Sequence, residues 1–210
     1  GAVASICFIQ LSGMEGIAAT IISILLGMIA GGIWGAIPGL LKVTRGLNEM
    51  IVSIMLNYVA TLFMGFIFTN LLREAEMPQT APVPDSTKLI DISEGLRAHV
   101  GIIIALVVAL AVFYFLKYTS KGFQLRAVGM NALASKVNGY YVGRLMLFSF
   151  IVSGAIAGMG GSIELHGKQF RLLSGFGSGF GFDGVAIALI AQLNPIATVI
   201  VAFFFAVLRK

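Results

Sequence analysis

The stretch GIAATIISILLGMIAGGIWGAIPGLL, residues 16–41, decides the fold of this chain. It contains no charged residue, and at about 1.5 Å per helical residue it is long enough to cross the roughly 30 Å hydrocarbon layer of a membrane. A helix of this length and composition has no place on the surface of a soluble domain. We therefore predict a complete transmembrane helix here, followed by a short linker at residues 42–48.

Glycines recur at every fourth position along this stretch, at Gly27, Gly31, Gly35 and Gly39. Such spacing places all four on one helical face, where the lack of side chains allows a neighbouring helix to approach closely. Helix packing is the expected role, and a permeation face is the alternative. Pro38 is expected to end or kink the helix, because proline removes a backbone hydrogen bond.

The composition of the whole chain agrees with a membrane protein. Apolar residues make up 58% of its 210 positions, with 26 glycines and 16 phenylalanines. A soluble domain of this size does not bury that much apolar surface, whereas a bilayer accepts it. The net charge of +5 comes from cations at the ends of apolar runs, which is a pattern of membrane topology and not of nucleic-acid binding.

Other apolar runs predict further membrane segments. Residues 1–11 form the end of a helix, and three more spans are predicted at residues 49–72, 99–116 and 145–163. Near the C-terminal end, Asn194-Pro195 separates residues 182–193 from residues 196–209, and each piece covers only about 20 Å as a helix. Short interrupted segments are typical of broken helices that line a transport path, and one kinked helix is the alternative.

These segments predict an all-α, polytopic transmembrane helical bundle with a broken helix near its C-terminal end. We expect residues 1–210 to form a single transmembrane domain and to be a fragment of a longer chain. The pair Gly154 and Gly158 in the span 145–163 predicts a second close helix contact.

The polar segment 117–144 carries five cations and no acid: Lys117, Lys121, Arg126, Lys136 and Arg144. Asn131 is suited to cap a short helix on which Leu133 and Val137, four residues apart, share an apolar side. A helix of this kind fits a groove on a soluble partner. The alternative is a loop whose charge only fixes orientation in the membrane.

The remaining polar segments complete the predicted topology. Three prolines in residues 73–97 indicate an extended, solvated loop, with a short surface helix beginning at Ser93; a landing surface for an external binding protein is the alternative. Residues 164–181 are rich in glycine and polar. Segments 42–48 and 117–144 together hold seven cations and the two opposite segments five, which modestly favours placing the first pair on the cytoplasmic side.

A polar stripe runs along the predicted span 49–72 and its start. Asn48, Ser53, Asn57 and Thr61 recur at intervals of four or five residues. Polar groups at membrane depth need partners in protein or in a water-filled path. The stripe therefore predicts either hydrogen bonds between helices or a path for a solute with hydroxyl groups or a base.

Several separated motifs resemble one family. The segment GFQLRAVGMNALA, residues 122–134, resembles the cytoplasmic coupling segment of permease subunits of bacterial ATP-binding-cassette (ABC) importers, in the group that carries simple sugars and nucleosides. The stretches NEMIVSIMLNY at 48–58, SGAIAG at 153–158 and GFGFDGVAIAL at 179–189 are similar to the same group. The resemblance extends from about residue 31 onward, but Ala-Gln-Leu at 191–193 departs from the pattern, so it implies no role for those three positions.

The resemblance implies a multi-pass permease of the bacterial cytoplasmic membrane, without catalytic residues or bound metal, that moves a nucleoside or simple sugar. It also implies two permease subunits, cytoplasmic ATPases that bind the ATP, and an external solute-binding protein; no cofactor belongs to this chain, which has no P-loop. We assign the ATPase contact to five residues: Arg126, Gly129, Asn131, Leu133 and Val137. We assign the translocation path to Ser53, Asn57 and Thr61.

The alternative function is a secondary transporter or channel that runs on an ion gradient. Such a protein needs a buried ionisable relay at mid-membrane, and the centres of the predicted spans contain no ionisable residue. A membrane scaffold without transport activity would leave the segment 117–144 and the broken helix unexplained.

Overall fold

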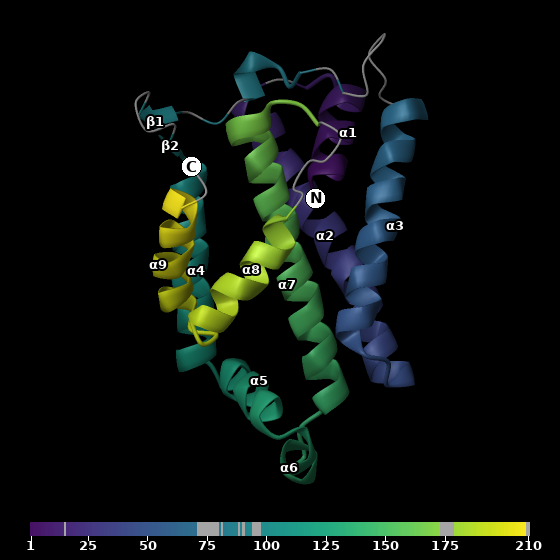
Figure 1. Cartoon of the computed structure of the whole chain (residues 1–210), viewed down its shortest axis with the longest axis vertical. Coiled ribbons are helices and arrows are strands. Elements are labelled where there is room, and N and C mark those ends of the chain that lie inside the picture. Colours follow the sequence, from purple (N-terminus) through teal and green to yellow (C-terminus); the bar gives the residue numbers. More distant parts are fainter. Residues whose placement is uncertain are drawn as a thin grey trace. The chain divides into compact units, whose positions relative to one another are not determined.

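The computed structural model describes residues 1–14, 16–70, 80, 82–87, 89, 91–93, 98–172 and 179–208 (Figure 1). The described part is almost entirely helical, which confirms the all-α prediction. Its helices fall into two compact units, one formed by residues Gly1–Gly101 with Tyr141–Ser174 and the other by Ile102–Tyr140 with Gly175–Lys210. Within the described residues, four helices are long and apolar enough to cross a membrane, namely those that begin at Ile17, Glu49, Gly101 and Val142.

Helix α2 (Ile17–Arg45) is the centre of the first unit, where it contacts α1 (Ala2–Ser12), α3 (Glu49–Asn70) and α7 (Val142–Glu164). Helices α2 and α7 are antiparallel, because Gly27 lies against Ser162 near one end of the pair and Val43 against Gly143 at the other. The ends that carry the linker after α2 and the start of α7 therefore lie together, as the alternation of spans predicts.

The predicted glycine packing is confirmed at this contact. A methyl group on Gly35 would lie 2.7 Å from the carbonyl oxygen of Phe150 and 3.0 Å from the Cα of Gly154. One on Gly39 would lie 2.7 Å from the Cβ of Phe150. The two distances of 2.7 Å are shorter than real Cβ atoms show, so glycine at these positions allows the two helices to approach this closely.

Pro38 does not end α2. Ending the helix was one of the two outcomes predicted from the sequence, and a kink was the other. The helix continues through it to Arg45, so the linker is shorter than predicted and comprises only residues 46–48. Gly46 closes the helix with φ 66°, and its N–H donates to the carbonyl of Lys42. Pro38 is itself buried, and its neighbour Gly39 lies against Phe150 of α7, so this part of α2 is held by packing although Pro38 lacks a backbone hydrogen bond.

The segment after α3 corrects the prediction of a solvated loop. Its described part contains η1 (Asp85–Thr87) and a small antiparallel sheet of β1 (Asp91–Ser93) and β2 (Ala98–His99). Thr80 and Thr87 are fully buried, and Val83 is nearly so. Ser93 belongs to a strand instead of starting a helix, while residues 71–79 and 94–97 of this loop lie outside the described residues.

Backbone hydrogen bonds attach this segment to the chain that follows α7. Thr80 donates its N–H to Leu172 over 3.2 Å, Val83 donates to Phe170 over 2.7 Å, and Leu89 donates to His166 over 3.0 Å. The segment lies along the chain after α7 because its backbone N–H groups are hydrogen-bonded to carbonyl groups there.

The polar stretch predicted to begin at residue 164 also differs in the structure. Helix α7 continues directly into a π-helical turn, η2 (Leu165–Gln169), and Leu165 and His166 are fully buried. Phe170 then takes a left-handed conformation with φ 54° and ends the helix, its N–H donating to the carbonyl of Leu165. Residues 173–178 of the predicted stretch lie outside the described residues.

The second unit contains α4 (Gly101–Tyr118) from its second residue onward, and also α5 (Ser120–Met130), α6 (Ala132–Val137), α8 (Phe180–Ile190) and α9 (Pro195–Leu208). Helix α4 begins two residues later than predicted and ends two residues later. Helices α8 and α9 contact each other and meet in a hairpin (Figure 1), which confirms the broken helix.

The turn between α8 and α9 explains why one kinked helix does not form. Gln192 and Leu193 both have positive φ, at 52° and 59°. The N–H of Leu193 returns to the carbonyl of Ala188, and the side chain of Asn194 accepts the N–H of Ile196 over 3.0 Å to start α9. The left-handed turn reverses the chain, while Asn194 and Pro195 are a favourable cap and first residue for the new helix.

Candidate docking element and translocation stripe

The docking element predicted in residues 117–144 consists of two consecutive helices, α5 and α6, that contact each other. Thr119 separates α5 from α4 and caps it, accepting the N–H of Gly122 over 3.0 Å. Gly122 is buried against the end of α4, where a methyl group on it would overlap with the carbonyl group of Phe115. The start of α5 is therefore packed tightly against the end of the spanning helix α4.

Asn131 caps α6 as predicted. Its side-chain oxygen accepts the N–H of Ala134 over 3.0 Å, and its extended backbone conformation separates α6 from α5. Leu133 and Val137 then lie one turn apart with 76% and 84% of their surfaces exposed. Ser135 faces inward and is buried, so the two apolar side chains form an outward face with nothing over it in the described part of the chain.

The other two residues assigned to docking lie on α5. Arg126 is exposed, and a methyl group added to Gly129 would meet no atom within 4 Å. The sequence did not predict α5 as a helix, and two of its apolar residues were missed as candidates. These are Phe123 and Met130, which are seven positions apart and 56% and 87% exposed. Their spacing of two helical turns was the signal that could have identified them.

The polar stripe lies on α3, where Ser53, Asn57 and Thr61 are all exposed. Their spacing of four residues places them on one side of the helix. The Thr61 hydroxyl donates to the carbonyl of Asn57 over 2.9 Å, so its hydrogen is used within α3. The Asn57 amide has no partner in the described part of the chain, which leaves two donors and a carbonyl oxygen for another group.

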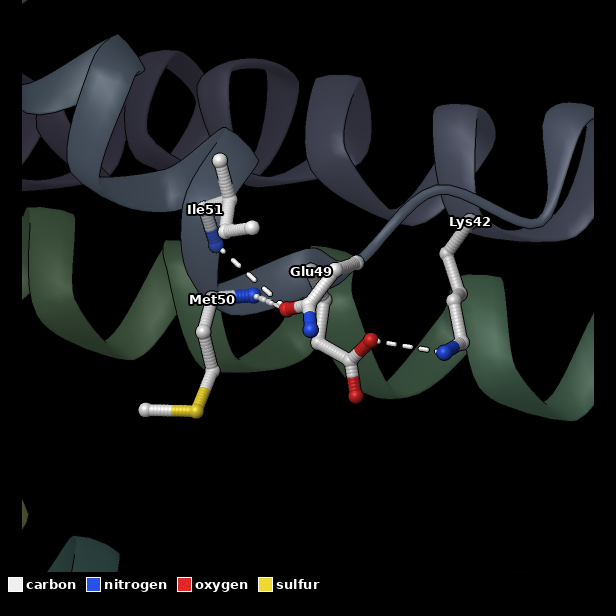
Figure 2. Close-up of polar contacts among 5 residues, drawn as sticks. Lys42, Glu49, Met50 and Ile51 are labelled. Atoms are coloured by element: carbon white, nitrogen blue, oxygen red, sulfur yellow. Dashed lines mark hydrogen bonds and ion pairs between the residues drawn. The ribbon is translucent and has the colours of Figure 1, made fainter.

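Asn48 does not belong to this stripe. Its side-chain oxygen accepts the N–H of Met50 over 2.9 Å and lies 3.4 Å from the N–H of Ile51, so Asn48 caps α3 (Figure 2). Next to it, Lys42 at the end of α2 pairs with Glu49 at the start of α3 over 2.7 Å. The cap and the ion pair fix the turn between the two helices.

Sequence reasoning missed a buried polar network at the other end of the first unit. Ser5 contacts Ser162 over 2.6 Å, and its hydroxyl also lies 2.8 Å from the carbonyl of Ser23. The Ser23 hydroxyl donates to Thr20 over 2.8 Å and lies 2.8 Å from Nε2 of His166.

This network connects α1, α2 and α7 where polar groups cannot reach water, since all four residues that form it are fully buried. Thr20 extends the contact to the segment after α3 by donating to the carbonyl of Thr87 over 3.0 Å. Isolated serines within apolar runs were the only sequence signal for it.

Comparison with known proteins places this arrangement in a family. Residues 1–210 match the family described as the branched-chain amino acid transport system / permease component. The chain belongs to this permease family. The match covers the entire sequence, so both helical units and the α5–α6 element fall within it. With its four long apolar helices, the chain is a multi-pass membrane protein.

Individual permeases of known name are similar to the chain. The guanosine ABC transporter permease protein NupP of Bacillus subtilis is 37% identical over 179 residues, which cover 82% of this chain and 51% of that protein. The nucleoside ABC transporter permease protein NupB of Lactococcus lactis is 31% identical over 89% of this chain and 54% of its own length. The glucose ABC transporter permease protein TsgB13 of Haloferax volcanii is 29% identical over 86% of this chain and 50% of its own length.

The chain thus spans about half the length of these curated relatives. No solved structure matches it. Membership of the permease family explains why the chain has long apolar helices and these sequence motifs. The roles of individual residues are argued from the contacts described above.

Proposed function

We propose that this chain is part of the permease subunit of an ABC importer that carries nucleosides or simple sugars across the bacterial cytoplasmic membrane. The similar proteins named for guanosine, nucleoside and glucose transport support this substrate class. The observation that carries the proposal is the α6 helix, which is capped by Asn131 and presents Leu133 and Val137 to the surroundings.

The partner of this face is a separate cytoplasmic ATPase of the ATP-binding-cassette type. Leu133 and Val137 would enter an apolar groove, while Arg126 on α5 offers charge to an acidic residue at its rim. Gly129 leaves space for the partner to approach α5 closely. ATP would be bound by that subunit, and the permease chain would need no cofactor or catalytic residue of its own.

The tight contact between Gly122 and Phe115 suggests how movement passes into the membrane. Because the start of α5 has no free space against the end of α4, a displacement of α5 would be transmitted to α4 instead of being absorbed at the junction. ATP binding at the partner would in this way favour one orientation of the spanning helices over another.

The solute would pass along the α3 stripe without covalent change. The amide of Asn57, which has no partner in the described part of the chain, can donate to and accept from hydroxyl groups or a nucleobase, and Ser53 adds a hydroxyl one turn away. The stripe is neutral, which suits uncharged polar solutes. A second permease subunit would complete the path, and an external solute-binding protein would deliver the solute to it.

Uptake of radiolabelled nucleosides and pentoses by cells that carry the complete transporter tests the proposal. The comparison is between an intact ATPase partner and one whose P-loop lysine has been changed. Uptake that disappears with the inactive ATPase supports the ABC importer, and competition among solutes then identifies the substrate class. Uptake that persists with the inactive ATPase but collapses with an ionophore would contradict the proposal and indicate a secondary transporter.

A further inference from the structure

The end of α4 carries a compact group of aromatic and cationic side chains that the proposed function does not use. The rings of Tyr114 and Tyr118 lie 5.2 Å apart, and Phe113 meets Tyr118 edge-on at 6.5 Å. The Lys117 ammonium lies 5.2 Å from the centre of the Phe113 ring and 5.7 Å from that of Tyr118. Lys121 follows, exposed on the first turn of α5.

The two tyrosines of this group are exposed, and its two lysines have no acidic partner in the described part of the chain. Tyr114 and Tyr118 are 63% and 62% exposed. In the described part of the chain Lys117 and Lys121 form no ion pair, whereas Lys42 and Lys168 each have a glutamate partner. Because residues 117–144 contain no acidic residue, nothing nearby in the sequence compensates the two positive charges.

The position of the group indicates what it meets. Helix α4 has 18 residues and therefore extends about 27 Å, close to the thickness of the hydrocarbon layer. A helix of this length that crosses the layer would place its last turn where hydrocarbon gives way to lipid headgroups, the depth at which tyrosine rings concentrate and lysine side chains extend toward water. A negatively charged headgroup would complement the two lysines at this depth.

We propose that Lys117, Tyr118 and Lys121 form a binding site for the headgroup of an anionic phospholipid. The ammonium groups would contact the lipid phosphate, while the rings of Phe113 and Tyr118 hold Lys117 in place from below. Since Gly122 fixes the start of α5 against α4, a lipid bound here would sit at the junction between the spanning helix and the docking element.

Binding of short-chain phosphatidylglycerol to the full chain, purified in a zwitterionic detergent, tests this site. The variant pair Lys117→Gln with Lys121→Gln should weaken binding about 25-fold, since each lysine near a membrane surface contributes about five-fold. The matched control is Lys136→Gln, an exposed lysine of α6 in the same acid-free segment, which should change binding less than two-fold. Lys117→Arg with Lys121→Arg should retain binding and shows that the positions tolerate substitution.

Phosphatidylcholine and inorganic phosphate distinguish the source of the charge. Phosphatidylcholine of the same chain length should bind much more weakly, and inorganic phosphate should not displace phosphatidylglycerol. An equal loss in Lys136→Gln, an unchanged affinity in the glutamine pair, or displacement by inorganic phosphate would overturn the proposal. None of these measurements depends on transport or on an ATPase, so the lipid site can fail while the proposed function stands.

Discussion

Gly31 of α2 lies so close to Gly154 of α7 that a methyl group on Gly31 would overlap with the carbonyl oxygen of Gly154. The same side of Gly31 also faces the Cα of Gly158. Both partners are glycines on an antiparallel helix, so each helix supplies the space that the other needs. This contact holds the first unit together along most of α2.

Replacing Gly31 with alanine should therefore destabilise the protein. Overpacking of a close contact typically costs about 1–3 kcal/mol, and here the obstacle is backbone that cannot rotate away. The matched control is Gly65→Ala on α3, where the added methyl meets no atom within 4 Å and should be neutral or slightly stabilising. Thermal unfolding in detergent compares the two; equal midpoints for both variants would contradict the packing account.

The buried network predicts a second effect on stability. Ser23→Ala removes the hydroxyl that is hydrogen-bonded to Nε2 of His166, and should lower the free energy of unfolding by about 1 kcal/mol. Ser149→Ala on α7 is the control, because within the described residues that exposed serine bonds only to the carbonyl of Leu145 on its own helix. Chemical denaturation that ranks Ser149→Ala as the more damaging change would show that the network contributes nothing.

Loss of the α6 cap should loosen the docking element without unfolding the protein. Asn131→Ala removes the acceptor for the Ala134 N–H and should cost about 1 kcal/mol of local helix stability, whereas Asn131→Asp keeps an acceptor. Hydrogen exchange of the Ala134 amide should become about five-fold faster in the alanine variant and remain near the native rate in the aspartate variant. Identical exchange in the two variants would rule out the cap.

The α3 stripe predicts a difference between neighbouring polar residues. Asn57→Leu should reduce solute uptake at least ten-fold at an unchanged amount of protein in the membrane, because it removes a free amide from the proposed path. Thr61→Val should reduce uptake less than two-fold, since that hydroxyl already donates within α3. If expression falls in parallel with uptake for Asn57→Leu, the residue serves packing instead of transport.

Regular spacing allowed much of this fold to be predicted from the sequence. The glycines of α2 and α7, the Asn131 cap and the exposed pair Leu133 and Val137 all depend on contacts within a few residues or on a single helical face. Such local relations are visible as a period of about four residues. The break at Asn194 was also predictable from the local sequence, because a residue suited to cap a helix stands directly before a proline.

Contacts between distant segments were not predictable. Thr80 meets Leu172 across 92 positions, and this contact, together with those of Val83 and Leu89, turns a proline-rich loop into a packed segment. Helix α5 was missed because the segment that contains it was interpreted by its charge, and its start is fixed by the contact of Gly122 with the end of α4. Helix α2 continues through Pro38 where it packs on α7, and this contact is not visible in the local sequence. In each case a tertiary contact overrides the local preference.

The central claim is that the exposed face of α6 binds the ATPase partner, and the affinity between the two proteins tests it most directly. The affinity should be measured for the native chain, for Leu133→Ala with Val137→Ala, and for the control Leu106→Ala, an exposed leucine on the spanning helix α4. We predict that the double variant weakens binding at least 30-fold, at about 1–2 kcal/mol for each buried side chain, while the control stays within two-fold. An affinity that is unchanged in the double variant, with the protein still folded, would contradict the account.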